Sequence, residues 1–249
     1  MTGRAVAIVQ ARVGSTRLPR KVLLPLIGEP ILALVMRRVA RARMVDEVVV
    51  ATTTLPEDEE VVDLAVAHGW PVERGSEADL LERYLAAARS HDAAIIVRIT
   101  SDCPLIDPEV IDRVIGAFKA SDVDYASNVI PPRSYPRGLD VEVIARTALE
   151  RAGREDHDPA WREHVTPYLY RHPERFRLVR VAADDDHSDQ RWSVDTPEDY
   201  ELLRRIYDAL GRDDATWREA LAVVDANPSW GMLNRAVVQK LVPPAGDGQ

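Results

Sequence analysis

Two kinds of hydrophobic pattern alternate along the first 100 residues. Nearly continuous apolar runs are typical of strands covered on both faces of a sheet, and they occur at 6–9, 47–51 and 93–99. Apolar residues spaced three to four positions apart predict amphipathic helices, at 31–43, 56–69 and 77–90, with Ser76 as the cap of the last. Strands that alternate with helices in this way predict a doubly wound α/β fold.

The second half of the chain has a less regular pattern. Three prolines within 128–137 predict a long surface loop. Strict alternation over 138–144 predicts a strand with Asp140 and Glu142 on one face. That face suits the hydroxyl or amine groups of a sugar, and a solvent-facing edge strand would give the same pattern. The other expected elements are strands at 176–182 and 191–194, and helices at 145–151, at 159–171, from Pro197 and near Trp217 and Trp230.

The length of the chain and the lack of linker-like segments limit how many domains it can contain. A chain of 249 residues that is 46% hydrophobic can bury a substantial core. No internal repeat or low-complexity linker marks a boundary. We therefore expect one domain over 1–249, with its core at about 4–210 and a helical extension at 211–249.

Charge and cysteine content narrow the classes of function. A net charge of −9 disfavours a general binder of nucleic acid or of membrane surfaces, since such proteins are usually basic. The single cysteine, Cys103, excludes an internal disulfide and favours a reducing compartment. The first apolar run is too short for a signal peptide, and no stretch is long and apolar enough to span a bilayer. We expect a cytoplasmic protein with no nucleic-acid or membrane partner.

Positive charge is concentrated just after the first predicted strand. Residues 12–21 carry four cations and no acid: Arg12, Arg17, Arg20 and Lys21. Such cations can neutralise several phosphate oxygens, Ser15 can donate a hydrogen bond, and Gly14 lets the backbone turn and approach a ligand. Neither common glycine-rich phosphate motif is present, and a solvated basic loop would look similar. The place at a strand's carboxyl end favours a polyphosphate site, because α/β sheets bind ligands there.

Two aspartates share a local pattern despite their distance in sequence. Asp102 and Asp195 each end a predicted strand, and each has a proline two residues later. If they meet at one edge of a parallel sheet, their oxygens could hold Mg²⁺ together with water and phosphate oxygens. On local physics alone, Asp195 is more simply a helix cap before Pro197, and Asp102 could be a turn residue.

Several motifs resemble one enzyme family. The segment A-R-x-G-S-T-R-L-P-x-K at 11–21 is similar to the signature loop of the cytidylyltransferases, which include the synthetases of CMP-Kdo and CMP-sialic acid. V-D-T-P-E-D-Y at 194–200 and R-I-T-S-D at 98–102 match further family motifs. G-L-D-V-E-V at 138–143 and R-E-H-V-T-P-Y at 162–168 resemble the spore-coat polysaccharide SpsF-like branch. Gln10 and the threonines at 52–54 differ from the residues that CMP-Kdo synthetases have at these positions. The resemblance therefore predicts the fold more firmly than it predicts which nucleotide base is bound.

The resemblance implies a fold and an activity. It implies a Rossmann-like, GT-A-like nucleotide-diphospho-sugar transferase fold, in which helices flank a mixed, mostly parallel sheet. It also implies Mg²⁺-dependent transfer of CMP from CTP to an acidic sugar, with pyrophosphate released, in the biosynthesis of surface polysaccharide or another glycan. Members of the family often form dimers, so the resemblance makes a homodimer one possible state of this protein.

The same resemblance distributes roles over this sequence. Catalytic roles fall on Arg12, Arg17, Lys21 and Asp102. Nucleotide contacts fall on Ala11, Arg12, Gly14, Ser15, Arg17, Lys21, Thr52, Thr53, Arg74 and Arg98. Substrate contacts fall on Arg137, Asp140, Glu142, Arg162 and His164, and the metal ligands are Asp102 and Asp195.

Two other functions compete with this one. A glycosyltransferase of related fold would use a D-x-D metal motif, which could be read at 122–124 or 184–186. A non-catalytic nucleotide-binding module would bind nucleotide without turnover, and the paired aspartates argue against it. His164 is a weak candidate for a general base, because a lone histidine more often makes a structural hydrogen bond. Cys103 is a weak nucleophile, because no histidine lies near it in sequence.

Overall fold

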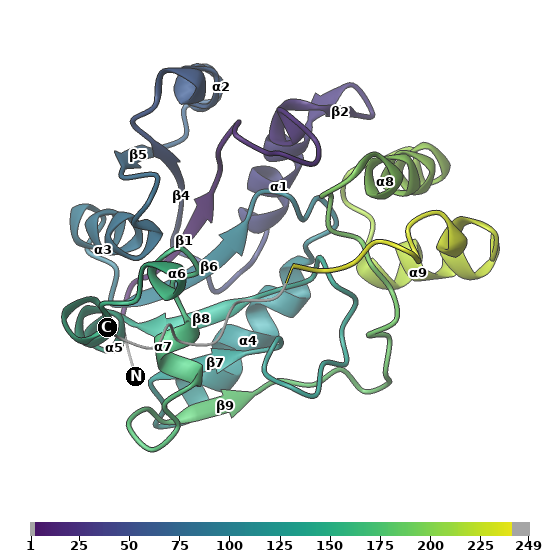
Figure 1. The fold of residues 1–249 in the computed structure, drawn as a ribbon. Coiled ribbons are helices and arrows are strands. Elements are labelled where there is room, and N and C mark those ends of the chain that lie inside the picture. Colours follow the sequence, from purple (N-terminus) through teal and green to yellow (C-terminus); the bar gives the residue numbers. More distant parts are fainter. Residues whose placement is uncertain (1–2, 241–249) are drawn as a thin grey trace.

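A seven-stranded sheet forms the centre of the protein (Figure 1). The computed structural model describes residues 3–240. The strands, in chain order, are β1 Ala5–Gln10, β4 Glu47–Thr53, β5 Val72–Gly75, β6 Ile95–Thr100, β7 Tyr125–Ser127, β8 Glu142–Ala145 and β9 Leu178–Arg180. They lie in the order β5-β4-β1-β6-β8-β7-β9. Only β8 runs antiparallel to its neighbours, so the predicted mixed, mostly parallel sheet is confirmed.

Helices flank this sheet. They are α1 Ile31–Val39, α2 Glu59–Ala67, α3 Leu80–Ser90, α4 Pro108–Ala120, α5 Arg146–Glu155, α6 Pro159–Arg162, α7 Pro167–Tyr170, α8 Pro197–Leu210 and α9 Trp217–Asp225. Three single turns of 3-10 helix accompany them, η1 Lys21–Leu23, η2 Pro56–Asp58 and η3 Trp230–Met232. A small hairpin of β2 (Pro25–Leu26) and β3 (Glu29–Pro30) turns through Ile27 and Gly28, which both have positive φ, as a tight two-residue turn requires.

The register of the sheet decides where a ligand can bind. β1 lies between β4 and β6, and the side chains of 5–9 are completely buried, which explains their continuous apolar run. Gln10, the last residue of β1, pairs with Ala51 on one side and Thr100 on the other. The segments that follow β1, β4 and β6 therefore emerge together at one edge of the sheet.

Several expected elements differ in the structure. The helix expected to reach residue 43 ends at Val39, and the helix expected from 77 starts at Leu80 with Asp79, not Ser76, as its cap. The helix expected over 159–171 is split into α6 and α7. Between them lies Val165, whose φ of 70° no helix accommodates.

The second half of the sheet departs most from expectation. Glu142 lies in β8, but Asp140 precedes the strand, so the two acids do not share one strand face. β8 is an interior strand paired on both sides, which makes the edge-strand interpretation wrong. No strand forms over 191–194, where a single bridge joins Arg191 to Arg137. The proline-rich loop is partly buried, because Asn128 and Tyr135 are each only 1% exposed.

The chain after α8 packs back onto the sheet domain. Arg38 of α1 is 1% exposed, and its guanidinium donates to the carbonyls of Ile106, Asp213 and Ala215. In Figure 1 the yellow end of the described chain runs from α9 back toward the middle of the molecule. Of the expected extension at 211–249, residues 241–249 lie outside the described part.

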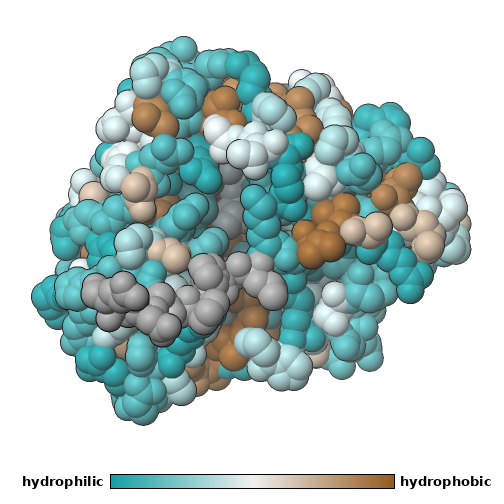
Figure 2. All heavy atoms as spheres, viewed as in Figure 1, coloured by the Kyte–Doolittle hydropathy of each residue, from teal (hydrophilic) through white to brown (hydrophobic). Residues whose placement is uncertain are grey.

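The viewed surface is mostly hydrophilic, with apolar patches separated from one another (Figure 2). Within residues 3–240 the exposed large apolar side chains are Ile27, Val66, Met232 and Val238. Across the same residues, no helix is both long and apolar enough to cross a membrane.

Candidate active site

The two aspartates singled out by their sequence pattern meet in the structure. Lys21 Nζ lies 2.7 Å from Asp102 Oδ2 and 2.8 Å from Asp195 Oδ1. Arg17 reaches the same Asp195 oxygen, with its Nη2 3.1 Å away. Asp102 and Asp195 are 81 and 174 positions away from Lys21 in sequence, and both contact its ammonium group. The cluster lies at the sheet edge where β1 and β6 end.

Backbone contacts hold Asp102 and Asp195 next to each other. Asp102 follows β6, and its carbonyl accepts a hydrogen bond from Val194 N at 2.8 Å. This bond fixes the segment before Asp195 beside the end of β6. The missing strand at 191–194 is therefore replaced by isolated contacts that reach the same place.

Asp199 and Arg191 support Asp195 from behind. The carboxylate of Asp199 is completely buried and accepts from the backbone N of Asp195 (3.0 Å) and of Thr196 (3.1 Å). Arg191 links the two acids, with Nη2 2.7 Å from Asp195 Oδ2 and Nε 2.8 Å from Asp199 Oδ1. Neither residue was among the sequence candidates. The spacing of Thr196 and Asp199 is a capping-box pattern, and it could have indicated Asp199.

The charges of the cluster reinforce one another. Burial alone would raise the pKa of Asp102, but the Lys21 ammonium and hydrogen bonds outweigh it and hold that pKa at about 2. Burial would likewise lower the pKa of Lys21, yet Asp102 and Asp195 raise it above its ordinary value. Asp102 is therefore ionised and Lys21 protonated at neutral pH.

The pair of carboxylates fits a divalent cation. Both converge on a point that a positive charge already occupies, and both side chains remain reachable, at 23% exposed for Asp102 and 14% for Asp195. Hard cations such as Mg²⁺ prefer oxygen ligands and keep several waters. No cluster of three or more acidic, histidine or cysteine side chains occurs in the part of the chain that the structure describes. Water and phosphate oxygens would have to complete the shell.

Acids at the start of α2 anchor the cationic loop. Asp58, 1% exposed, accepts from Val13 N at 2.6 Å and from the hydroxyl of Thr53. Glu60 pairs with Arg20 at the other end of the loop. Nothing in the local sequence distinguishes Asp58 from the acids beside it, so only the structure shows that it positions the loop.

The remaining loop candidates are placed as follows. Arg12 is 44% exposed and 3.1 Å from Glu77, a surface pair that a ligand can replace at little cost. Ser15 Oγ accepts from Leu18 N at 3.4 Å, and Ala11 N donates to Ala51 O. Gly14 has no positive φ, and a Cβ there would meet nothing within 4 Å. The backbone at Gly14 therefore does not require glycine for a left-handed turn, and the open space beside it leaves room for the close approach of a ligand, which stays a prediction.

Thr53 and Arg74, candidates at the ends of β4 and β5, have structural partners, whereas the buried hydroxyl of Thr52 has none among residues 3–240. Thr52 and Thr53 are completely buried, and the Thr53 hydroxyl is engaged by Asp58. Arg74 donates to Thr53 O at 3.0 Å and pairs with Glu59 at 2.8 Å. This placement favours a role in holding the end of β4 over direct contact with a nucleobase.

Three further candidates make ion pairs or hydrogen bonds within the protein: Arg98, Glu142 and Arg162. Arg98 and Glu142 form an ion pair with side chains only 13% and 6% exposed, and Tyr125 donates to Glu142 at 2.6 Å. Arg162 pairs with Asp79 at 2.7 Å and donates to two backbone carbonyls. These contacts explain the residues as parts of the fold.

Asp140, His164 and Arg137 differ in how far they are engaged. Asp140 is held by both guanidinium nitrogens of Arg133, at 2.6 and 2.9 Å. His164 is half-buried, and burial lowers its pKa, which keeps it neutral at pH 7. Arg137 makes no side-chain hydrogen bond or ion pair with any residue among 3–240. Burial raises the pKa of the Cys103 thiol well above its ordinary value, which argues against a nucleophile.

The D-x-D segments that would indicate a glycosyltransferase contain aspartates that form ion pairs at the surface. Asp122 and Asp124 both pair with Arg177, and Asp184 pairs with Arg113 at 3.0 Å. Their carboxylates are thus occupied by arginines and do not join Asp102.

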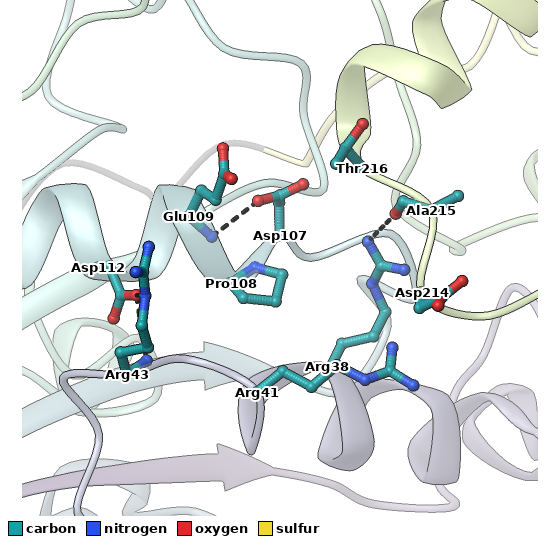
Figure 3. A pocket seen from close by; sticks show the side chains of 10 residues that line it. All are labelled: Arg38, Arg41, Arg43, Asp107, Pro108, Glu109, Asp112, Asp214, Ala215 and Thr216. Atoms are coloured by element: carbon teal, nitrogen blue, oxygen red, sulfur yellow. Dashed lines mark hydrogen bonds and ion pairs between the residues drawn. The ribbon is translucent and has the colours of Figure 1, made fainter.

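A cavity of about 300 Å³ lies between α1, α4 and the start of α9 (Figure 3), and contacts within the protein involve several of the residues that line it. Arg41 pairs there with Asp213, and Arg43 lies near Asp112. Asp107 caps α4 and accepts from Trp217 N at 2.8 Å. These contacts fasten the chain after α8 to the sheet domain.

The chain matches one family model over most of its length. That model, described as cytidylyltransferase, covers residues 6–225. The chain belongs to the cytidylyltransferase family, and it is accordingly a nucleotidyltransferase enzyme.

Individual relatives agree. This cytidylyltransferase is 34% identical over 235 residues to the spore coat polysaccharide biosynthesis protein SpsF of Bacillus subtilis, covering 89% of this chain and 94% of SpsF. A solved cytidylyltransferase of Leptospira borgpetersenii superposes with a TM-score of 0.89 at 33% identity, covering 95% of this chain and 99% of the other. A CMP:2-keto-3-deoxy-manno-octonic acid synthetase complexed with CTP shares the fold, with a TM-score of 0.63 at 22% identity, over 83% of this chain and 99% of the other.

Proposed function

We propose that this cytidylyltransferase transfers CMP from CTP to a hydroxyl of an acidic sugar, with Mg²⁺ as its metal. The observation that carries the proposal is the convergence of Asp102 and Asp195 on Lys21 at the carboxyl end of the sheet. Two solvent-reachable carboxylates beside a loop of cations suit a metal-bound triphosphate better than a neutral ligand.

In this reaction the sugar hydroxyl attacks the α-phosphorus in line and gives its proton to water. The bond between the α-phosphorus and the bridging oxygen breaks, and pyrophosphate leaves. Arg12 and Ser15 hold the triphosphate, while Arg17 and Lys21 offset the charge that grows on the leaving group. Asp102 and Asp195 hold Mg²⁺, which supplies Lewis-acid polarisation of the α-phosphate.

Most of the work that the residues do is positioning. Asp58 fixes the loop through Val13, and Asp199 with Arg191 fixes Asp195. Such chemistry needs no covalent intermediate with the protein, because orientation and electrostatic stabilisation account for phosphoryl-transfer catalysis.

The proposed acceptor is the kind of compound handled by the Kdo synthetase of similar fold, and a glycan pathway follows from the likeness to SpsF. The contacts expected for Thr52, Thr53, Arg74, Arg98, Asp140, Glu142, Arg162 and His164 stay predictions. So do the cytoplasmic location, the single-domain organisation and the homodimer.

Pyrophosphate release tests the proposal. Each of the four nucleoside triphosphates is incubated with Mg²⁺ and with Kdo, sialic, legionaminic or pseudaminic acid. Release is expected with CTP and at least one acid, and it should stop when the metal is chelated. Release with another triphosphate would overturn the base assignment and keep the mechanism.

A further inference from the structure

A second cavity lies beside Arg191, between residues 188–191 and the end of the described chain at 231–239. Its volume is about 500 Å³, and Arg137 and Arg191 both line it. Arg191 also contacts Asp195 at 2.7 Å, so the cavity and the acidic pair share a wall. The other walls come from α8, α9 and residues 231–239.

The lining is mixed in charge and rich in hydrogen-bonding groups. Its charged and amide side chains are Arg137, Arg191, Arg235, Asp189, Asp225, Gln190, Asn234 and Gln239. Arginines bind carboxylates in bidentate geometry, and carboxylates and amides bind hydroxyls. A small ligand that fits this set carries one anionic group and several hydroxyls.

Among residues 3–240, Arg137 is the half-buried cation of this lining that has no acidic partner, whereas Arg235 is exposed. The guanidinium of Arg191 already contacts Asp195, Asp199 and Gln239. Arg137 has no such partner within residues 3–240, and Asp140, an acid near enough to affect it, is held by Arg133. Burial lowers the pKa of Arg137, and the nearby Arg133 and Arg191 lower it further. A half-buried cation with cationic neighbours gains stability when an anion binds.

We propose that this cavity binds the sugar acceptor, with the sugar's carboxylate on Arg137 and its reacting hydroxyl toward Asp195. The inference rests on the proposed function, because it supplies that reaction's second substrate. It adds that the chain after α8 forms a wall of the acceptor site.

Gly231 offers a way to fill the cavity. It lines the cavity, and a Cβ placed on it would meet no atom within 4 Å. Gly231→Leu should therefore raise KM for the acidic sugar at least about tenfold while KM for CTP stays within about twofold. Gly231→Ala is the matched control, since its single methyl group leaves most of the volume open.

The carboxylate contact is tested by changing both of its sides. The acid that supports turnover is compared with its neutral carboxamide, in wild type and in Arg137→Met. Wild type should prefer the acid by about ten- to a hundredfold in kcat/KM, the range of a charge-assisted hydrogen bond. Arg137→Met should lose that preference, whereas a merely structural role would weaken both compounds equally. Arg43→Met, at a position 86% exposed, is the control for removal of an arginine.

The outcomes separate the cavity from the reaction. If CTP and an acidic sugar react but Gly231→Leu and Arg137→Met keep the wild-type KM for the sugar, the cavity assignment is overturned and the proposed function stands. If none of the four acids supports turnover, saturation-transfer NMR follows their binding directly. Binding that both variants abolish keeps the cavity assignment and overturns the reaction, and no binding to wild type overturns both.

Discussion

Two charged clusters near β6 have the same ingredients and different surroundings. Lys21 bridges two carboxylates at the end of the strand, and its partners are 14% and 23% exposed. Arg98, inside the strand, faces one carboxylate, Glu142, which is 6% exposed and also bonded to Tyr125. The first cluster has more acid oxygens than its lysine can satisfy, and solvent reaches them. The second is a closed neutral pair.

The difference separates a binding site from a structural ion pair. A carboxylate at the solvent edge can exchange an ammonium partner for a metal or for water. A buried pair cannot release either member without leaving an uncompensated charge in the interior. The same residue types therefore predict loss of turnover in one place and loss of stability in the other.

The largest effect is expected from Asp102→Asn. The amide keeps the shape and removes the charge that holds the metal, so turnover should fall at least about a thousandfold. The free energy of unfolding should fall by no more than the ~1–2 kcal/mol that the ion pair with Lys21 contributes, so the variant stays folded. Asp124→Asn, at a carboxylate that pairs with Arg177 outside the proposed site, is the matched control and should keep the turnover of wild type. Wild-type turnover in folded Asp102→Asn would sink the assignment.

The converse effect is expected from Arg98→Met. It leaves the Glu142 carboxylate buried without its cation, which should cost about 3–5 kcal/mol in the free energy of unfolding. Arg98→Met/Glu142→Leu should recover part of that loss, because it buries no unpaired charge. Urea unfolding measures both variants. A rise in KM for CTP with unchanged stability would instead support the nucleotide contact expected from the sequence.

A smaller effect is expected where the loop is anchored. Asp58→Ala leaves Val13 N and the Thr53 hydroxyl without their acceptor, each a loss of about 1–3 kcal/mol. We expect kcat/KM for CTP to fall about tenfold or more as the loop loosens. Glu57→Ala, one residue earlier, serves as the control. Equal losses in the two variants would show that Asp58 has no special role.

The parallel half of the sheet was predictable because its signal is local. The runs at 6–9, 47–51 and 93–99 are short, apolar and flanked by turns, and each forms a strand. The cationic loop and the two aspartates follow these strands or match family motifs, so they could be named in advance.

The mixed half was less predictable because its structure depends on distant partners. Alternation over 138–144 is the same whether the chain pairs or runs extended, and only residues from 142 onward pair with β6 and β7. Val194 reaches Asp102 through one hydrogen bond instead of a strand. Asp58 and Arg191 look like ordinary surface charges in sequence, since their roles come from neighbours 45 and 4 residues away.

The smallest effect concerns pH and the Lys21 cluster. The pKa of Asp102 is about 2 in the folded protein, below its ordinary 3.8, despite burial and because of Lys21. A depressed carboxyl pKa contributes stability that is fully present above the unfolded pKa and is lost as the pH falls toward the folded one. In Lys21→Met that contribution is absent.

Wild type should therefore exceed Lys21→Met in the free energy of unfolding by about 1–2 kcal/mol near neutral pH. Urea unfolding should show this difference shrinking from about pH 5 to about pH 3, where Asp102 begins to be protonated. Lys119→Met makes the same substitution at a lysine outside the cluster and should show no such trend. A difference between wild type and Lys21→Met that is constant over this range would mean that Lys21 stabilises the fold by packing alone, and that the charge of Asp102 is set elsewhere.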